Sequence, residues 1–500
     1  MRLSVGWKPP GPELVPTDTV VPVPLMDDQQ LGRNSCVHHT YIFNDVLDTD
    51  KLQRSLQRLL EIGGWRKLGA RVRMNLDYHI PARYDAERPG FIFTTVAHPI
   101  KIGDHPLASY LPKSMGKPAL FEPFERITSL CLHPDCPQKL EDWLYSDQPQ
   151  LNVHVVVFHD ATLLTMTFMH FFMDGMSIAL VFRAWSAVLN GCEEQVPSFR
   201  GIDEDLLRPQ TTIVPASDYM HYKKWLRGFK MFIFSLRSFW ESIRFPHEER
   251  RHFCIPGDVI GTMRSQMLQE LGTSLPNEHQ PAFLSEGDVL LAWCLRATLK
   301  GLGVSPSRSI ALFSVFDARS SLLRVSETND AFVMNVILLS STYMRARDII
   351  HLPLSSIAWQ IRHSLILQRT RSQCQAQLGA MRAALDKTGT TAFFAEPTSL
   401  LIGCSNWHKG RFYDIDFSAA VTLAGDPAAG RRNCLGRPLH IICNKRSGRF
   451  SMRNMGLIYG KDAAGDWWVS WTLRPDAWDT IQLELKKLEQ LGKLEKQYTG

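Results

Sequence analysis

The stretch best suited to chemistry is Met169-His170-Phe171-Phe172-Met173-Asp174-Gly175, in which an imidazole and a carboxylate are four positions apart. The run before it, residues 162–168, is apolar and rich in Thr, which is typical of a buried strand. The run after it carries apolar residues at near-helical spacing as far as Asn190-Gly191. His170 is therefore expected at the end of a strand, where an imidazole can act as a general base near neutral pH.

Strands and helices that position this junction alternate along the whole chain. Residues 152–158 and 162–169 form a predicted hairpin, and Asp48 and Ser285 each begin a predicted helix. The pattern also predicts a long helix over 354–382, a helix after Pro475, and strands at 37–43, 310–315, 412–417, 439–443, 455–459 and 467–473. This mixture predicts an α/β protein.

A chain of 500 residues exceeds what one hydrophobic core normally organises, so we expect two domains. The N-terminal domain is expected over 1–190 and the C-terminal domain over 245–500, with a crossover linker at 191–244. The Pro-rich opening, to about residue 30, is expected to wrap over the surface. Aromatic and basic residues interleave over 222–243. We expect this helix to pack on its own protein with a basic outer face, contact with a membrane surface being the alternative.

Composition excludes several classes of function. The net charge of +6 comes from 56 basic and 50 acidic residues spread along the chain, which does not favour nucleic-acid binding. The ten cysteines lack the spacing of a zinc site, and neither a dinucleotide-binding nor a phosphate-binding glycine pattern is present. The sequence has no signal peptide and no apolar run that could span a bilayer, so we expect a cytoplasmic protein.

Several separated patches together resemble the BAHD-type (His-x-x-x-Asp), coenzyme A-dependent acyltransferases of plants and fungi. Order and spacing agree over nearly the whole chain, and the basic-aromatic linker suits the fungal branch. The matching patches are His170 to Gly175, Asp317-Ala318-Arg319, Ser405-Asn406-Trp407 with Asp416-Phe417, and Leu56-x-x-Leu59 with Trp65 to Arg71. There are two departures: the family has Asp-Phe-Gly-Trp-Gly where this chain has Asp416-Phe417-Ser418-Ala419-Ala420, and a Gly-Asn pair is common where this chain has Met334-Asn335.

The resemblance implies a fold and a reaction. The fold would be two chloramphenicol-acetyltransferase-like domains, each a mixed β-sheet flanked by helices, with the active-site tunnel between them. The reaction would be direct transfer from acetyl-CoA, or another acyl-CoA, to a hydroxyl of an apolar secondary metabolite such as a terpenoid, meroterpenoid or alkaloid. No metal is required, and we expect a monomer.

The resemblance also implies residue roles. His170 would be the general base, while Asp174 would point away from the substrate and pair with Arg319. Ser405, Trp407 and Asp416 match the region that serves the oxyanion or the acyl donor. The strand at 37–43 borders the acceptor pocket in the family, which makes His38 and His39 candidates for that pocket.

Other interpretations of the same residues stay open. His170 could be a hydrogen-bonded core histidine, Asp174 a helix cap, and Trp407 a core residue. Gly175-Met176-Ser177 resembles half of a nucleophile elbow, which would suit a serine esterase, although Ala179 replaces the second Gly. A third alternative is a catalytically inactive relative that only binds a partner.

Overall fold

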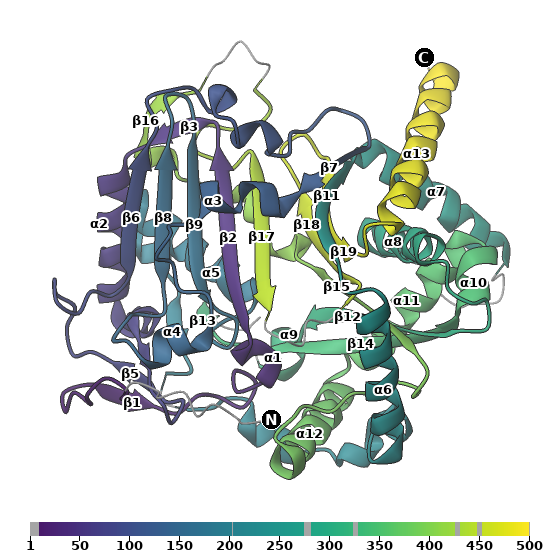
Figure 1. The fold of residues 1–500 in the computed structure, drawn as a ribbon, viewed down its shortest axis with the longest axis horizontal. Helices are drawn as coiled ribbons and strands as arrows, with labels where there is room; N and C mark the ends of the chain where they lie inside the picture. The colour runs from purple at the N-terminus through teal and green to yellow at the C-terminus, as the bar shows by residue number, and fades with distance from the viewer. Residues whose placement is uncertain are drawn as a thin grey trace.

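The computed structural model describes residues 10–202, 204–274, 282–323, 329–425, 431–447 and 453–499. Two β-sheets, one of five strands and one of seven, lie side by side (Figure 1). The five-stranded sheet has the order β17 (His440–Ser447), β2 (Ser35–Phe43), β9 (Thr162–Met169), β8 (Asn152–Val157) and β6 (Ile92–Ala97). The seven-stranded sheet has the order β14 (Ile337–Arg345), β12 (Ser309–Asp317), β15 (Leu400–Asn406), β18 (Met455–Lys461), β19 (Trp467–Leu473), β11 (Glu249–Ile255) and β7 (Ala119–Pro123).

Both sheets are mixed, as expected. The pairs β6·β8, β12·β15 and β15·β18 are parallel, and the other neighbours in the two sheets are antiparallel. Three small sheets complete the pairing, formed by β1 (Thr19–Val21), β5 (Tyr78–Ile80) and β4 (Arg71–Val72), by β10 (Ser198–Arg200) and β13 (Asp330–Phe332), and by β16 (Val421–Ala424) and β3 (Asp45–Leu47).

The two sheets exchange strands between the halves of the sequence. β17, from near the C-terminus, pairs with β2 along its whole length at the edge of the five-stranded sheet. In return β7, from the first 130 residues, lies at the edge of the seven-stranded sheet beside β11. Neither sheet is therefore built from one continuous stretch of sequence. The domain limits at 190 and 244 remain a prediction.

Helices cover the sheets and complete two main cores. In the described part of the chain they are α1 (Gln30–Arg33), α2 (Thr49–Glu61), α3 (Thr128–Cys131), α4 (Leu140–Leu144), α5 (Gly175–Leu189), α6 (Phe229–Arg244), α7 (Gly257–Ser274), α8 (Glu286–Leu302), α9 (Arg319–Leu322), α10 (Ala346–His351), α11 (Leu354–Gln368), α12 (Arg371–Thr388) and α13 (Ala477–Thr499). α2 and α5 share one core with the five-stranded sheet. α7, α8, α11 and α13 share the second with the seven-stranded sheet.

Local signals near the motif give the expected elements. β8 and β9 form the predicted antiparallel hairpin, and every residue of β9 and of β2 is buried. Asp48 caps α2 by accepting hydrogen bonds from the backbone N–H groups of Asp50 and Lys51. Ser285 caps α8 in the same way, through the N–H of Asp288. Because β9 is buried and pairs with a strand on each side, the backbone position of His170, which follows it, is fixed.

Four expectations about elements are wrong in whole or in part. The helix expected over 354–382 is two helices, because Thr370 is extended and begins a new helix at Arg371. Residues 412–417 form no strand: Phe412–Asp414 is a short 3-10 turn after Arg411, whose φ of 50° is left-handed, and residues 415–417 are irregular. The apolar side chains of this segment pack in the first core. In the opening segment, residues 10–23 are mostly exposed, as expected, but Leu25, Met26 and Asp27 at its end are buried.

The fourth wrong expectation concerns the helix of the crossover. It begins only at Phe229, after Gly228, and none of its sixteen residues, all of them described, is buried. The expected basic outer face is partly apolar instead.

Candidate active site

His170 directly follows β9, the central strand of the five-stranded sheet. Its backbone is held on both sides: its N–H donates to the carbonyl of Ser35 at 2.8 Å, and its carbonyl accepts from Nδ2 of Asn335 at 3.0 Å. The side chain is half-buried and lines the cavity described below. A fixed backbone therefore carries an imidazole that reaches open space.

Asp174 and Arg319 form a buried ion pair that joins the motif to the other sheet. Nη1 and Nη2 of Arg319 each donate to one carboxylate oxygen at 3.0 Å. The backbone N–H groups of Ser177 and Val336 donate to the same two oxygens at 2.8 and 2.9 Å, so Asp174 also caps α5. The structure contains both the pairing that the family resemblance implies and the helix cap that the sequence allows as an alternative. None of these four bonds goes to His170.

Burial and the charge of Arg319 act on Asp174 in opposite directions. Burial favours the neutral acid, but the guanidinium and the two N–H donors outweigh it and hold the pKa of Asp174 below its usual range. Arg319 also donates to the carbonyls of Phe332 and Met334 and to Asp317. The pair is satisfied on both sides, which is the condition under which a buried ion pair is tolerated.

Asn335 and Asp27 form a second buried cluster, which the sequence analysis missed. The Asn335 side chain bridges the carbonyl of His170 and Oδ1 of Asp27, with bonds of 3.0 and 2.8 Å. Its backbone N–H also donates to Oδ1 of Asp27 at 2.6 Å. Oδ2 of Asp27 has no partner among the described residues, and burial raises the pKa of Asp27 to about 7. The opening segment thus supports the loop that carries His170.

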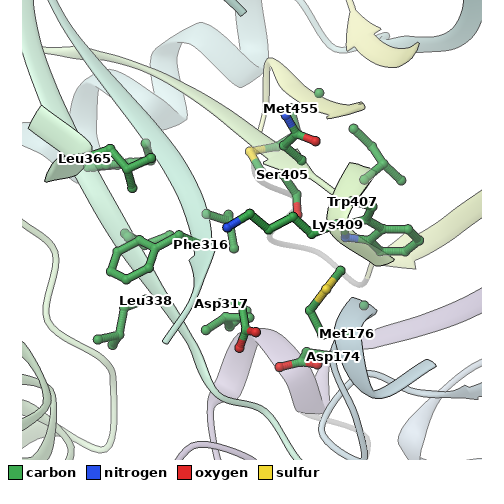
Figure 2. A pocket seen from close by; sticks show the side chains of 18 of the residues that line it. Asp174, Met176, Phe316, Asp317, Leu338, Leu365, Ser405, Trp407, Lys409 and Met455 are labelled. Carbon is green, nitrogen blue, oxygen red and sulfur yellow. The ribbon is translucent and has the colours of Figure 1, made fainter. Parts of the chain in front are cut away.

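A cavity of about 820 Å³ lies between the two sheets. Figure 2 shows Phe316, Leu338 and Leu365 on one side of it and Trp407 and Met176 on the other, with Lys409 pointing inward. Asp174 is also among the residues that line it, so the residue is not wholly turned away from the cavity, although its carboxylate is fully bonded to the protein. Further apolar walls come from Phe313, Val315, Ile337, Leu339, Phe393 and Phe394.

Ser405 and Trp407 line the same cavity as His170. The Trp407 indole lies directly against Gly175, where a Cβ would come within 2.5 Å of Cε2 and Nε1 of the ring. The glycine after Asp174 is therefore required by close approach of the indole. Within the described part of the chain, neither Nε1 of Trp407 nor Oγ of Ser405 donates a hydrogen bond to protein.

The other candidates lie outside the cavity, as far as the described residues define it. His39 is buried among the rings of Tyr41, Phe182, Trp407 and Phe412, so it supports Trp407 from behind. His38 is on the opposite face of β2, with Nδ1 2.9 Å from Oγ1 of Thr167. The carboxylate of Asp416 accepts from the N–H of Ser418 at 2.8 Å and begins a 3-10 turn.

The electrostatic surroundings keep the candidate base neutral. Burial, together with the positive charge of Lys445, lowers the pKa of His170 to about 4. Burial also lowers the pKa of Lys445 to about 8, with a contribution from Arg250. At neutral pH the imidazole therefore carries no charge and is free to accept a proton.

The nucleophile-elbow interpretation is not supported by the position of Ser177. Its hydroxyl is buried, donates to the carbonyl of Met334 at 2.8 Å, and accepts from Nη2 of Arg319 at the same distance. Ser177 does not line the cavity in the part of the chain that the structure describes. Its hydroxyl belongs to the Asp174–Arg319 network.

Comparison with known proteins agrees with these features. The model of the Transferase family matches residues 136–429. Acetyltransferase adrJ of Penicillium roqueforti is 36% identical, covering 98% of this chain and 99% of its own. O-acyltransferase pboC of Aspergillus ustus is also 36% identical, with 89% and 94% covered.

A solved structure shares the fold. TRI101 of F. sporotrichioides, in complex with coenzyme A and T-2, aligns with a TM-score of 0.66 at 16% identity, covering 93% of this chain and 97% of its own. The two-domain mixed α/β fold expected from the sequence is thereby confirmed. Because the family match and the relatives cover most of its length, the chain belongs to the Transferase family, the BAHD-type acyltransferases, and is an acyltransferase with fungal relatives.

Proposed function

We propose that this enzyme transfers an acyl group, most simply acetyl, from an acyl-CoA to a hydroxyl of an apolar secondary metabolite such as a terpenoid, meroterpenoid or alkaloid. The observation that carries the proposal is the neutral imidazole of His170, fixed by its backbone at the end of β9 and lining a cavity of about 820 Å³. A cavity of this size has room for a small-molecule acceptor beside a thioester.

His170 acts as the general base. As the acceptor oxygen attacks the thioester carbon, the ring nitrogen that faces the cavity takes the hydroxyl proton. A tetrahedral intermediate forms, its C–S bond breaks, and the proton passes to the departing thiolate. The products are the ester and free thiol, and His170 returns to its neutral state. Asp174 takes no part in proton transfer, since all its bonds go to Arg319 and to backbone N–H groups.

Two polar groups are suited to stabilise the negative charge on the intermediate. Nε1 of Trp407 and Oγ of Ser405 line the cavity and keep their donors uncommitted within the described residues. Donors already in place at a developing oxyanion contribute strongly to catalysis. We assign them this role in preference to Asp416, whose carboxylate serves the 3-10 turn.

The wall of the cavity has charged and apolar parts, which suit the acyl-CoA and the apolar acceptor respectively. Lys409, Lys461, Arg264 and Arg362 contribute cations to the lining, which favours the phosphates of an acyl-CoA. Lys409 has no acidic partner in the described part of the chain, and Figure 2 shows it pointing inward. Phe316, Leu338 and Leu365 favour an acceptor with a hydrocarbon skeleton.

The test is incubation of the purified chain with acetyl-CoA and a panel of hydroxylated terpenoids, followed by released thiol and product mass. Esterification of at least one apolar alcohol, absent without enzyme, is the expected result. Water-soluble amines acylated in place of alcohols would contradict the assignment of the acceptor.

Direct transfer is tested separately by mass spectrometry of the protein after mixing with acetyl-CoA alone. Since the geometry offers no activated Ser or Cys nucleophile among the described residues, no covalent acyl-enzyme should accumulate. A stable adduct of acetyl mass on the chain would contradict the ternary-complex mechanism while leaving the acyltransferase activity intact.

A further inference from the structure

Helix α6 carries an apolar stripe that faces away from the protein. The stripe consists of six side chains that are 55% to 75% exposed: Phe229, Phe232, Leu236, Phe239, Trp240 and Ile243. Their spacing places them within about 100° of arc on one face of the helix. Six large apolar groups on one face exceed the scattered exposure usual for a protein surface.

The opposite face of the same helix accounts for its attachment to the protein. Met231 and Phe234 pack against a small apolar cluster that includes Leu226, Ala311 and Phe313. Two turns after Phe234, Glu241 accepts from Arg308 at 2.7 Å. The helix is therefore held by one face, and the apolar stripe is free of contacts that would hide it.

The flank of the stripe is basic. Lys230, Arg237 and Arg244 recur every seven residues, which puts them on one side of the stripe, and all three are exposed. Lys223 and Arg227 add exposed cations just before the helix. The sole acidic residue of segment 222–247 is Glu241, which faces Arg308.

We propose that α6 docks on an anionic phospholipid surface, with the stripe of Phe229, Phe232, Leu236, Phe239, Trp240 and Ile243 inserted at the headgroup boundary. An apolar face bordered by Lys and Arg, with Phe and Trp among its members, is what an interfacial helix requires. Lipid phosphates and carboxylates complement the basic flank. A second copy of the chain fits less well, because two such basic flanks repel each other.

Docking is parallel to the surface, not through it. No helix in the described part of the chain is long and apolar enough to cross a bilayer. The cluster under α6 also includes Phe313, Leu339 and Phe393, which line the cavity. A docked α6 therefore brings the apolar wall of the cavity close to the lipid. The docking itself does not depend on the proposed function.

The experiment is co-sedimentation of the full chain with vesicles of phosphatidylcholine alone and of phosphatidylcholine with phosphatidylserine. The chain should bind the anionic vesicles and bind the neutral ones weakly. The variant Phe232→Gln/Leu236→Gln/Trp240→Gln should reduce the partition coefficient at least about tenfold. Neutralising two cations, Lys230→Gln/Arg237→Gln, should reduce it about thirtyfold, and salt should do the same.

A matched control is Leu423→Gln/Leu483→Gln, which removes two equally exposed leucines outside α6 and should bind as the parent does. Circular dichroism and the melting temperature confirm that each variant is folded. The proposal is overturned if the parent stays in the supernatant with anionic vesicles, or if the apolar variant binds like the control. It is also overturned if light scattering finds a dimer that the apolar variant abolishes.

Discussion

Two buried carboxylates, Asp174 and Asp27, flank the loop that carries His170, and they are stabilised in different ways. Asp174 faces a guanidinium and two N–H donors, and its pKa is lowered. Asp27 faces the neutral amide of Asn335, keeps one oxygen without a partner in the described structure, and has its pKa raised to about 7. The two carboxylates lie near the same loop, but their partners differ. Asp174 is therefore charged at neutral pH, whereas Asp27 titrates near neutrality.

The difference shows which interactions fix the loop and which tune it. An ion pair that links two sheets fixes position, because breaking it leaves a charge buried without a partner. A carboxylate bonded to an amide can lose its charge without losing those bonds, since either protonation state can accept from N–H. Neither carboxylate is bonded to the imidazole. Variants of His170 should therefore change mainly the rate of the reaction, and variants of the carboxylates and their partners mainly the stability of the fold.

The largest expected effect is on turnover, in His170→Ala. Loss of a positioned base typically reduces the rate about a hundredfold to ten-thousandfold. Because the ring lies at the cavity and its supporting bonds come from the backbone, the melting temperature should change little. Turnover is measured by thiol release with acetyl-CoA and an accepted alcohol, and the melting temperature by calorimetry. A folded variant with near-parental turnover would refute the base assignment.

The next effect is on stability, in Arg319→Ala. Removal of one partner leaves Asp174 charged and buried, which costs about 3–5 kcal/mol of unfolding free energy. Urea unfolding should register the loss, with activity falling alongside it. The double variant Asp174→Ala/Arg319→Ala should be less destabilised than the sum of the single variants. Strict additivity would mean that the pair contributes nothing as a pair.

Asp27→Asn should change stability in a pH-dependent way. The pKa of Asp27 is about 7 in the folded chain against an ordinary 3.8, so the unfolded chain loses its proton first as pH rises. The parent therefore loses stability between about pH 4 and 7, by up to about 1.4 kcal/mol per pH unit, and the variant does not. Urea midpoints of both proteins at pH 5 and pH 8 test this. A constant difference between them would contradict the burial-raised pKa.

The smallest effect concerns the pKa of His170 in Lys445→Met. Burial is the main cause of the lowered pKa and remains in the variant, while the repulsion from Lys445 is removed. The pKa should rise from about 4 but stay below the ordinary 6.5. The neutral ring is the active form. As the pH is lowered, the activity of the variant should therefore begin to fall at a higher pH than the activity of the parent does. NMR titration of the imidazole checks the shift, with Lys409→Met as a control cation of the same cavity.

Signals near the motif predicted its local structure well. The apolar Thr-rich run, the hairpin and the Asp174 cap all lie within 25 residues of His170, and each depends on short-range preferences that the sequence states directly. The contact between Asp174 and Arg319 joins distant segments and came from the family resemblance. The strand predicted at 412–417 was wrong, because alternating apolar residues fit both an edge strand and an irregular segment whose side chains fill a core.

What the sequence left undetermined was where distant segments meet. Asp27 lies in a Pro-rich opening that has no periodicity, so its contact with Asn335 had no local signal. Asn335 stands where the family often has a Gly-Asn pair, and that was the available hint. The exposure of the apolar face of α6 could not be predicted either, because aromatic residues at helical spacing are buried in most helices.

The pairing of β17 with β2 has a consequence for how the chain folds during synthesis. Ile42 pairs with His440, and at about 5–20 residues per second the ribosome needs roughly 20–80 s to make the chain between them. During that time β2, every residue of which is buried in the finished protein, has one unpaired edge. Unpaired edges recruit other strands, so nascent chains that stop before residue 440 should aggregate unless a chaperone covers that edge.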